Sequence, residues 1–239
     1  MQWRRLRRVS ATARAGVFFE MPTALPCGRH TLSRTQVESA QRERLMRAFV
    51  EELAQRGYAD VRVAAVCERA GVSRASFYEL FADKEDCVCA AHRRYTEVVT
   101  RHAIEAGVNQ TKTWRRFIET SLDAYFDVLA ADPLIARGFT VDMQSIGPAV
   151  SRLQAQALRD FARGRMLGER RLRRSDPLLK ARPYHVHLGS VHVQRGLARD
   201  ALEANPAPDF AQMRHDLVGW FVASWYGEEP ADRAGPPAA

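Results

Sequence analysis

The stretch CERAGVSRASFYELFADKEDC, from Cys67 to Cys87, decides the fold. Its apolar residues recur at helical spacing, stop at a three-residue break that begins at Gly71, and then resume at once. Gly71 permits a tight turn, and the hydroxyl of Ser73 can cap the helix that follows. We therefore expect two short helices that meet at this turn and form a helix-turn-helix.

A longer helix precedes this pair. Ser33 and Gln36 have the spacing of a capping box, which opens a helix, and Gly57 follows the last residue of the pattern and ends it. The apolar face of this helix repeats at helical spacing and consists of Leu45, Ala48, Phe49 and Leu53. The helix would support the two short helices, which are expected over about residues 63–70 and 73–81.

The second short helix presents one face outward instead of burying all of its surface. Phe77, Leu80 and Phe81 fall on one side of it. Ala75 and Glu79 point the opposite way. A helix of about two turns with small or polar residues outward fits the major groove of DNA. Packing accounts for the three apolar residues, but it does not account for the break that exposes the opposite face.

The charge of the chain favours an anionic partner. The 239 residues carry a net charge of +8 and a pI near 9.8, which suggests nucleic acid before membrane. Of the 36 basic residues only three are lysine, which reflects either phosphate recognition by arginine or a GC-rich genome. Because no apolar run reaches about 18 residues, we expect no transmembrane helix and no membrane partner.

The ends of the chain and the cysteines leave this expectation unchanged. Residues 1–32 are expected to be a basic, disordered leader, unless translation begins at Met21, and residues 229–239 to be a disordered tail. The four cysteines form no CxxC pair and have no zinc-site spacing. This usage favours a reducing, cytoplasmic setting, and we expect neither a bound metal nor any other cofactor.

The segment RGYADVRVAAVCERAGVSRASFYELFADKED, from Arg56 to Asp86, resembles the DNA-binding unit of the TetR-type repressor family. The preceding stretch, LPCGRHTLSRTQVESAQRERL, looks like the leader of an actinobacterial branch of that family. Beyond about Tyr95 the resemblance is only architectural. The residues that carry it are Gly57-Tyr58, Ala70-Gly71-Val72-Ser73, Tyr78, Phe81 and Lys84-Glu85.

The resemblance implies an architecture and roles for the matched residues. An N-terminal three-helix domain, residues 33–82, would bind DNA and be joined through a long helix to a C-terminal helical bundle, residues 83–228, used for ligand binding and dimerisation. Tyr78 and Lys84 would contact phosphates, the lysine at a helix N-terminus. The rest of this helix-turn-helix site comprises Ser73, Arg74, Ala75 and Ser76, of which the last three face the bases.

The segment departs from the family pattern at three positions. Arg62 stands where the family usually has Ser or Thr, so it cannot cap the second helix, although its charge can hold the same phosphate. Ala75 replaces a usual glycine, and Leu80 replaces a histidine that often contacts phosphate. These changes leave DNA binding in place but put the operator sequence in doubt. Glu79 either accepts a hydrogen bond from a cytosine or faces solvent.

Helical periodicity continues through the second half and no stretch alternates as a strand does, so the whole chain is predicted to be all-α. Further helices are expected over about 84–107, 113–131, from 133, 148–168, 184–204 and 208–226, with a charged loop over 169–183. The last two helices carry more apolar surface than a monomer readily hides, which favours a homodimer. Residues that either line a ligand pocket or form plain core are Trp114, Phe117, Tyr125, Phe126, Phe139 and Met143.

The sequence contains none of the motifs that would indicate an enzyme: no Gly-rich phosphate loop, no GxSxG and no HExxH. We therefore expect a cytoplasmic, dimeric regulator of transcription that binds double-stranded DNA at a palindromic operator. Its simplest form is a repressor that an unknown small-molecule effector releases from DNA. The alternative is a helix-turn-helix regulator or interaction module without a ligand response.

Overall fold

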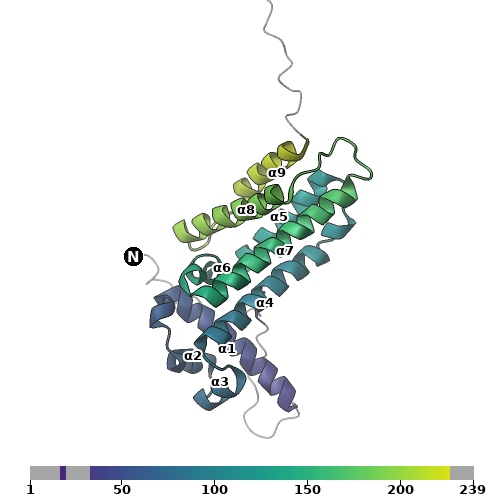
Figure 1. Cartoon of the computed structure of the whole chain (residues 1–239). Coiled ribbons are helices and arrows are strands. Elements are labelled where there is room, and N and C mark those ends of the chain that lie inside the picture. Colours follow the sequence, from purple (N-terminus) through teal and green to yellow (C-terminus); the bar gives the residue numbers. More distant parts are fainter. Residues whose placement is uncertain (1–16, 20–32, 227–239) are drawn as a thin grey trace, which may run out of the picture.

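The computed structural model describes residues 17–19 and 33–226 (Figure 1). Within these residues the secondary structure is helical, without a strand, so the prediction of an all-α fold is confirmed. The α-helices are α1 (Arg34–Arg56), α2 (Val63–Ala70), α3 (Arg74–Leu80), α4 (Lys84–Glu105), α5 (Trp114–Ala131), α6 (Pro133–Thr140), α7 (Pro148–Leu172), α8 (Tyr184–Ala204) and α9 (Ala211–Tyr226). Short 3-10 helices are η2 (Tyr58–Asp60), η3 (Val108–Gln110) and η4 (Asp142–Ser145).

Local sequence signals set the boundaries of the N-terminal helices. Ser33 Oγ accepts a hydrogen bond from the Gln36 backbone N–H at 3.2 Å, and Gln36 Oε1 accepts one from the Ser33 N–H at 2.8 Å. The predicted capping box is therefore confirmed. Gly57 ends α1 and Gly71 ends α2, both with positive φ, +77° and +64°, which only glycine adopts at little cost.

The helices form an elongated molecule with the helix-turn-helix at one end. Figure 1 shows α2 and α3 together at this end, and α4 leading from α3 along α7 toward the other end. In the bundle α7 packs on α8, and α5 packs on α9. Two contacts join the end that carries α2 and α3 to the bundle: α1 packs on both α4 and α6. One hydrophobic core accordingly runs from α1 to α9 without a gap at residue 83.

The contact between α1 and α6 is close. A Cβ added to Gly138 of α6 would lie 2.4 Å from Val50 Cγ1 and 3.3 Å from the Val50 carbonyl oxygen on α1. Only a residue without a side chain lets the two helices approach this far. Gly138 therefore sets the spacing between the N-terminal domain and the bundle.

Residues 17–19 differ from the rest of the predicted leader. Phe18 and Phe19 are fully buried, and their rings lie 5.9 Å and 6.2 Å from the ring of Phe139. Phe18 also lies 5.4 Å from the ring of Tyr95 on α4. For these three residues the expectation of a disordered leader is wrong, because two large apolar side chains are part of the core. The remainder of residues 1–32 and the predicted tail lie outside the described residues.

One helix boundary in the bundle was also predicted wrongly. The charged stretch from Glu169 was expected to be loop, but α7 continues to Leu172. The reason is that Glu169 is buried, with 2% of its surface exposed, and carries its charge inside the helix bundle. The sequence does not show whether a charged side chain is hydrated at the surface or hydrogen-bonded to a buried partner.

The last two helices hide more apolar surface within the monomer than expected. The buried residues of the predicted dimer face are Val191, Leu202, Phe210, Leu217, Phe221 and Trp225. Leu197 on α8 and Trp220 on α9 stay exposed, at 39% and 49%. The outer face of α8 also exposes Val186 and Val193. The surplus apolar surface is thus a narrow stripe and not two whole helix faces.

Candidate nucleic-acid interface and ligand cavity

The start of α3 is fixed by its own first residues. Ser73 Oγ accepts a hydrogen bond from the Ser76 N–H at 3.0 Å, and the two hydroxyl oxygens lie 2.9 Å apart. Phe77 is fully buried and its ring meets that of Phe81 at 5.6 Å. Ser73 is therefore a helix cap, which orients the N-terminus of α3 toward solvent.

The outward face of α3 carries the residues predicted to meet DNA. Arg74 and Ala75 are exposed, and Glu79 lies exposed beside them. Tyr78 is 59% exposed, and its ring packs edge-on against Phe77 at 5.3 Å. Its hydroxyl makes no hydrogen bond to any residue that the structure describes. The structure thus brings Arg74, Ala75 and Tyr78 together on one accessible surface.

The end of α3 is held by an arginine of the supporting helix. Arg42 of α1 donates from Nη1 to the Leu80 carbonyl oxygen at 2.5 Å, and its guanidinium lies 4.3 Å from the centre of the Phe81 ring. Such a contact combines a charge-assisted hydrogen bond with a cation–π interaction. Because both ends of α3 are held, its outward side chains keep a fixed orientation.

Arg62 and Lys84 lie near the N-terminus of α2. Arg62 is the exposed N-cap residue of α2 and makes no side-chain cap, as its chemistry predicts. Lys84 Nζ donates to the carbonyl oxygens of Tyr58 and Val61, at 3.1 Å and 3.4 Å, and lies 4.2 Å from the centre of the Tyr58 ring. Lys84 therefore ties α4 to the loop before α2 and has only part of its donor capacity left for a phosphate.

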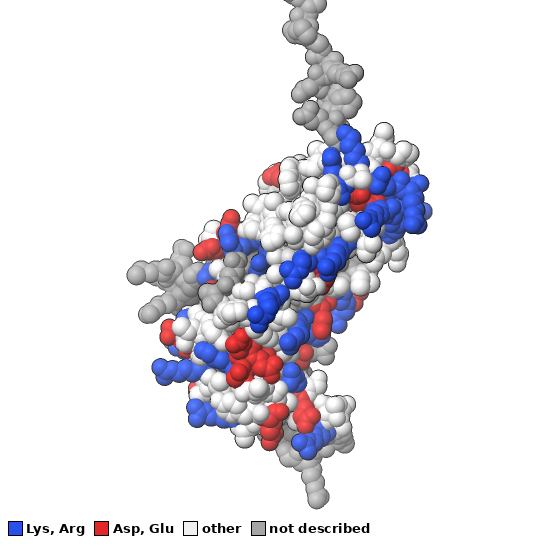
Figure 2. Space-filling model, in the orientation of Figure 1, with Lys and Arg blue, Asp and Glu red and all other residues white. Residues whose placement is uncertain are grey.

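Net charge alone does not locate the DNA-binding surface. Figure 2 shows arginines gathered at the end of the molecule opposite the helix-turn-helix, around the C-terminal end of α7. Some of these side chains have structural roles: Arg171 donates to the Val108 carbonyl oxygen, and Arg173 donates to that of Leu179. The interface is therefore identified by the geometry of α3 and not by the density of positive charge.

A cavity of about 340 Å³ lies among α4, α5, α6, α7 and α8. Three of the six residues predicted to line a pocket do line it, namely Phe117, Tyr125 and Phe139. The other three are core residues: Trp114 packs against Trp225, Phe126 packs on Phe210, and Met143 is 1% exposed. The aromatic residues of α5 therefore divide between the cavity lining and the hydrophobic core, because one helix face is wide enough to border both.

Sequence reasoning missed the polar groups of the cavity. The wall of α4 includes His92 and Tyr95, and α7 and α8 contribute Arg165 and Arg195. A signal was present: Arg165 falls at the helical spacing of the buried α7 residues Leu158, Ala162, Glu169 and Leu172. A charged residue at such an apolar position is typical of a buried functional or structural site.

Burial controls the ionisation of these groups. It lowers the pKa of His92 to about 4, with help from the nearby charges of Arg195 and Arg93, so His92 is neutral at pH 7. Burial also lowers the pKa of Arg165 to about 10 and raises the pKa values of Tyr95 and Tyr125. At neutral pH the guanidinium groups are therefore the charged groups on the inner wall of the cavity.

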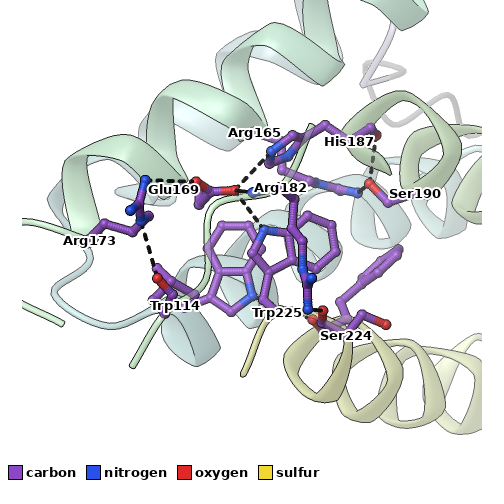
Figure 3. A network of polar contacts seen from close by, with 11 residues as sticks. Trp114, Arg165, Glu169, Arg173, Arg182, His187, Ser190, Ser224 and Trp225 are labelled. Carbon is purple, nitrogen blue, oxygen red and sulfur yellow. Dashed lines mark hydrogen bonds and ion pairs between the residues drawn. The ribbon is translucent and has the colours of Figure 1, made fainter. Parts of the chain in front are cut away.

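A second buried polar group lies beside the cavity, in the network of Figure 3. Glu169 Oε2 accepts hydrogen bonds from the Arg182 backbone N–H and from Trp225 Nε1, each at 3.0 Å. The same oxygen lies 3.0 Å from His187 Nε2, and Arg173 approaches the other carboxylate oxygen. Burial lowers the pKa of His187, although Glu169 opposes this. This network fastens α7, α8 and α9 together.

Two elements connect the cavity to the end of the molecule that carries α2 and α3. The first turn of α4 holds the loop before α2 through Lys84, and the same helix lines the cavity with His92, Tyr95 and Val99. On α6, Phe139 lines the cavity, and the preceding residue Gly138 contacts α1. Movement of either helix on ligand binding would therefore displace part of the N-terminal domain.

The described residues offer little for a metal or a membrane. Searched over this part of the chain, no three His, Cys, Asp or Glu side chains lie close enough together to form a metal site. None of the helices there has both the length and the hydropathy needed to span a bilayer.

Sequence comparison finds matches to the N-terminal part of the chain. Residues 45–91 match the model of the bacterial regulatory proteins of the tetR family, from the middle of α1 into α4. The HTH-type transcriptional regulator BetI of Stenotrophomonas maltophilia (strain R551-3) is 31% identical over 91 residues, which are 36% of this chain and 46% of that protein. The match thus spans less than half the length of this curated relative.

Solved structures share the fold over most of the chain. The fatty acid degradation regulator FadR from Bacillus halodurans superposes with a TM-score of 0.68 at 14% identity, over 76% of this chain and 94% of its own. FadR from Bacillus subtilis, in complex with stearoyl-CoA, gives 0.64 at 15% identity over 75% and 97%. A putative regulator from Saccharomonospora viridis, in complex with choline, gives 0.62 at 16% over 78% and 98%. The relatives are transcriptional regulators and not enzymes.

Proposed function

We propose that this protein is a homodimeric transcriptional repressor that binds a two-fold-symmetric operator through α3 and leaves it when a small ligand fills the cavity. The observation that carries the proposal is the short, doubly anchored α3, whose exposed face lies within the segment that matches the tetR family model. We extend the resemblance to the actinobacterial branch suggested by residues 25–45. The proposed site of action is the cytoplasm, where a bacterial operator is accessible.

In the proposed complex α3 enters the major groove. Arg74, Ala75 and Ser76 face base edges, where Arg74 donates to guanine and the Ala75 methyl group meets a thymine methyl. Tyr78 contributes its free hydroxyl to a phosphate, and Ser73 holds the helix start at the groove. Arg62 and Lys84 add positive charge beside the N-terminus of α2, where the backbone amides also favour a phosphate.

Dimerisation is proposed to use the apolar stripe of α8 and α9. Val186, Val193 and Leu197 recur at helical spacing on the outer face of α8, and Trp220 lies exposed on α9. Gly189 and Gly196 lie on the same outer face with open space around them, so a second helix can approach closely. Pairing this stripe with its symmetry mate would form a four-helix bundle, and a dimer that reads one duplex would need its two α3 helices about 34 Å apart.

Release from DNA is proposed to follow from a population shift. A ligand that fits the cavity better when α4 and α6 have moved favours the arrangement in which the two α3 helices lose groove register. The solved relatives named above include one with stearoyl-CoA and one with choline, which supports a ligand site in this fold without identifying the ligand. The alternative is a regulator or interaction module without a ligand response. In that case the cavity would be a packing defect that binds no ligand.

The first test is footprinting of the full chain on the intergenic DNA beside its own gene at near-physiological salt. A protected, two-fold-symmetric site is expected. Arg74→Ala should weaken binding to this site by roughly 1–3 kcal/mol and relax base preference at one position of each half-site. The matched control is Arg116→Ala, which removes an exposed arginine of α5 and should leave the footprint unchanged.

Two results would contradict parts of the proposal. Salt-sensitive coating of all DNA, with no preferred site beside the gene, would argue against a specific regulator of that gene. A specific footprint that no compound from a broad metabolite screen weakens would favour the alternative without a ligand response.

A further inference from the structure

The guanidinium of Arg165 is buried beside the cavity without an anionic partner. The residue is 7% exposed; Nη1 donates to Ser190 Oγ at 2.6 Å and Nη2 to Gln194 Oε1 at 2.8 Å. Its charge also lies 4.8 Å from the centre of the Phe221 ring. Both acceptors are neutral, and no carboxylate of the described chain pairs with it. A buried charge that has only neutral partners is costly and favours an anion nearby.

A second arginine of the cavity lining also lacks an anionic partner. Arg195 of α8 lines the cavity, is half-buried, and forms neither a hydrogen bond nor an ion pair with any described residue. Its charge acts on the cavity, because it contributes to the low pKa of His92. The one acidic residue of the cavity lining, Asp160, is exposed and pairs with Arg163 at 2.8 Å. The buried part of the cavity lining therefore carries the positive charges of Arg165 and Arg195 without a carboxylate to pair with them.

The cavity also holds an unsatisfied donor. Gln154 is 8% exposed and lines the cavity, and its Nε2 is buried without a hydrogen-bond partner among the described residues. The Tyr125 hydroxyl of the same lining is buried as well. Buried donors are normally paired, so a ligand that brings acceptor oxygens would complete this wall.

Apolar side chains make up much of the remaining lining, beside the polar residues Thr96, Thr100, Asn109 and Ser121, and the cavity volume is modest. Val99, Ala103, Phe117, Phe139 and Phe161 provide hydrophobic and aromatic surface. The cavity volume of about 340 Å³ lies at the small end of the range of about 300–1,000 Å³ for ligand sites. This space suits a compact apolar body with a single polar head.

We propose that the cavity binds a compact organic acid, whose apolar body packs on the aromatic wall and whose carboxylate is held by Arg165 and Arg195 with the amide of Gln154. This inference rests on the proposed function, because it names the chemical class of the releasing ligand. A planar guanidinium can donate two parallel hydrogen bonds to a carboxylate, and an ammonium or a neutral head lacks this match.

The test compares three probes with the same eight-carbon chain: octanoate, 1-octanol and octylamine. Binding to the full-length protein is measured by titration calorimetry and by the shift in thermal unfolding temperature. Octanoate is expected to bind at least about tenfold more tightly than either other probe, since a charge-assisted hydrogen bond contributes that much. Equal binding of all three, tighter binding of the alcohol or the amine, or no binding of octanoate at millimolar concentration would overturn the inference.

Variants locate the carboxylate. Arg195→Gln should weaken octanoate binding by about ten- to a hundredfold and leave 1-octanol binding unchanged, and it removes no hydrogen bond or ion pair between described residues. Arg165→Gln should also weaken octanoate binding, but it removes buried hydrogen bonds within the protein as well. The Arg195→Gln variant is therefore the decisive test of the carboxylate site. Arg152→Gln removes an exposed arginine from the outer face of α7 and is the control. An unchanged octanoate affinity in Arg195→Gln would refute the assignment.

Footprinting in parallel separates this inference from the proposed function. A specific footprint together with octanoate binding no tighter than its neutral analogue would overturn the ligand class alone. Octanoate binding that depends on Arg195, in a protein with no specific DNA site, would contradict the regulator and leave the ligand class in place. Release of the footprint by octanoate, lost in Arg195→Gln, is the result expected if both hold.

Discussion

Tyr78 has the exposure and the support that a positioning contact needs. Its ring is braced by Phe77, so the side chain loses little further entropy on contact with a surface. Its hydroxyl has no partner among the described residues, and in the proposed complex it meets a phosphate. A phosphate contact sets affinity and orientation without reading sequence.

Tyr78→Phe is expected to weaken binding to all DNA sequences alike, by roughly 1 kcal/mol or about fivefold, because it removes one hydrogen bond and keeps the ring. Fluorescence anisotropy with several duplexes at fixed salt measures this. Tyr226→Phe, which removes a hydroxyl bonded to Asp176 at the far end of the molecule, is the control. A changed preference among the duplexes would contradict the phosphate role.

His92 makes the stability of the protein depend on pH. Its pKa falls from 6.5 to about 4 on folding, so the unfolded chain takes up a proton at a pH where the folded protein does not. The stabilisation is full above pH 6.5 and is lost as the pH falls toward 4. Asp142 acts in the opposite sense, because burial raises its pKa from 3.8 to about 6 and its contribution is lost as the pH rises through 6.

His92→Gln isolates this effect, since Asp142 and His187 are present in both proteins. Between pH 7 and pH 5 the wild-type protein should lose roughly 2 kcal/mol more stability than the variant. Urea unfolding at the two pH values measures the difference. Identical losses in the two proteins would show that His92 takes up its proton as readily in the folded state as in the unfolded chain.

At the scale of residues, the sequence predicts the hydrogen bonds of side chains whose partners are close in the chain. The Ser33–Gln36 box and the Ser73 cap are of this kind. Arg165 and Glu169 are not, because their partners lie on α8 and in later segments, and nothing local distinguishes them from a solvated charged face. Half of the predicted cavity residues were therefore found, and the charged ones were not.

At the scale of helices, α4 and α6 each contact both the cavity and the end that is proposed to bind DNA. Helix type and order followed from periodicity and caps, and eight of the nine α-helices begin within about two residues of the sequence expectation. The start of α9 and the end of α7 differ more, since there tertiary contacts decide where the chain turns. The contact of α6 with α1 had no sequence signal beyond a glycine.

Gly138→Ala is expected to destabilise the protein by about 1–3 kcal/mol, because the new methyl group would overlap the stiff side chain of Val50 and force α6 away from α1. Thermal and urea unfolding measure the loss. The control is Gly164→Ala, also inside a helix but with open space around the added methyl, which should be neutral or stabilising by up to about 1 kcal/mol. Equal effects of the two changes would mean that the helices have room to adjust.

At the scale of the whole molecule, residues far apart in the chain complete one core. Phe18 and Phe19 pack against Phe139 on α6, and Tyr95 of α4 stacks on the same ring at 4.5 Å. Two of these rings, Tyr95 and Phe139, also line the cavity. The N-terminal segment therefore backs the wall that a ligand would contact.

A chain that starts at Met21 should be less stable than the full chain, by on the order of 3–5 kcal/mol, because it lacks both buried phenylalanines. A chain that starts at Val17 keeps them and is the matched control. Urea unfolding of the three proteins measures the difference. Equal stability of the Met21 and Val17 forms would show that the two rings contribute nothing to the folded state.

Leu197→Glu should convert the proposed dimer to monomer, because a charge placed in an apolar helix interface is left without a partner. Sedimentation velocity over a range of protein concentrations measures this. Leu178→Glu is the control, since Leu178 is 76% exposed in the loop before α8 and lies outside the stripe. A dimer that survives Leu197→Glu would exclude this face of α8.

The placement of the tryptophans also gives the protein an optical signal that separates assembly from folding. Trp114 and Trp225 are buried and pack against each other in the network of Figure 3, so their fluorescence emission reports whether the bundle is intact. The Trp220 side chain is 49% exposed and belongs to the apolar stripe of α8 and α9. Its fluorescence emission should move to shorter wavelength when a second subunit covers it. Dilution would then shift the spectrum of a folded protein, and Trp220→Phe would abolish that shift while leaving the unfolding signal in place.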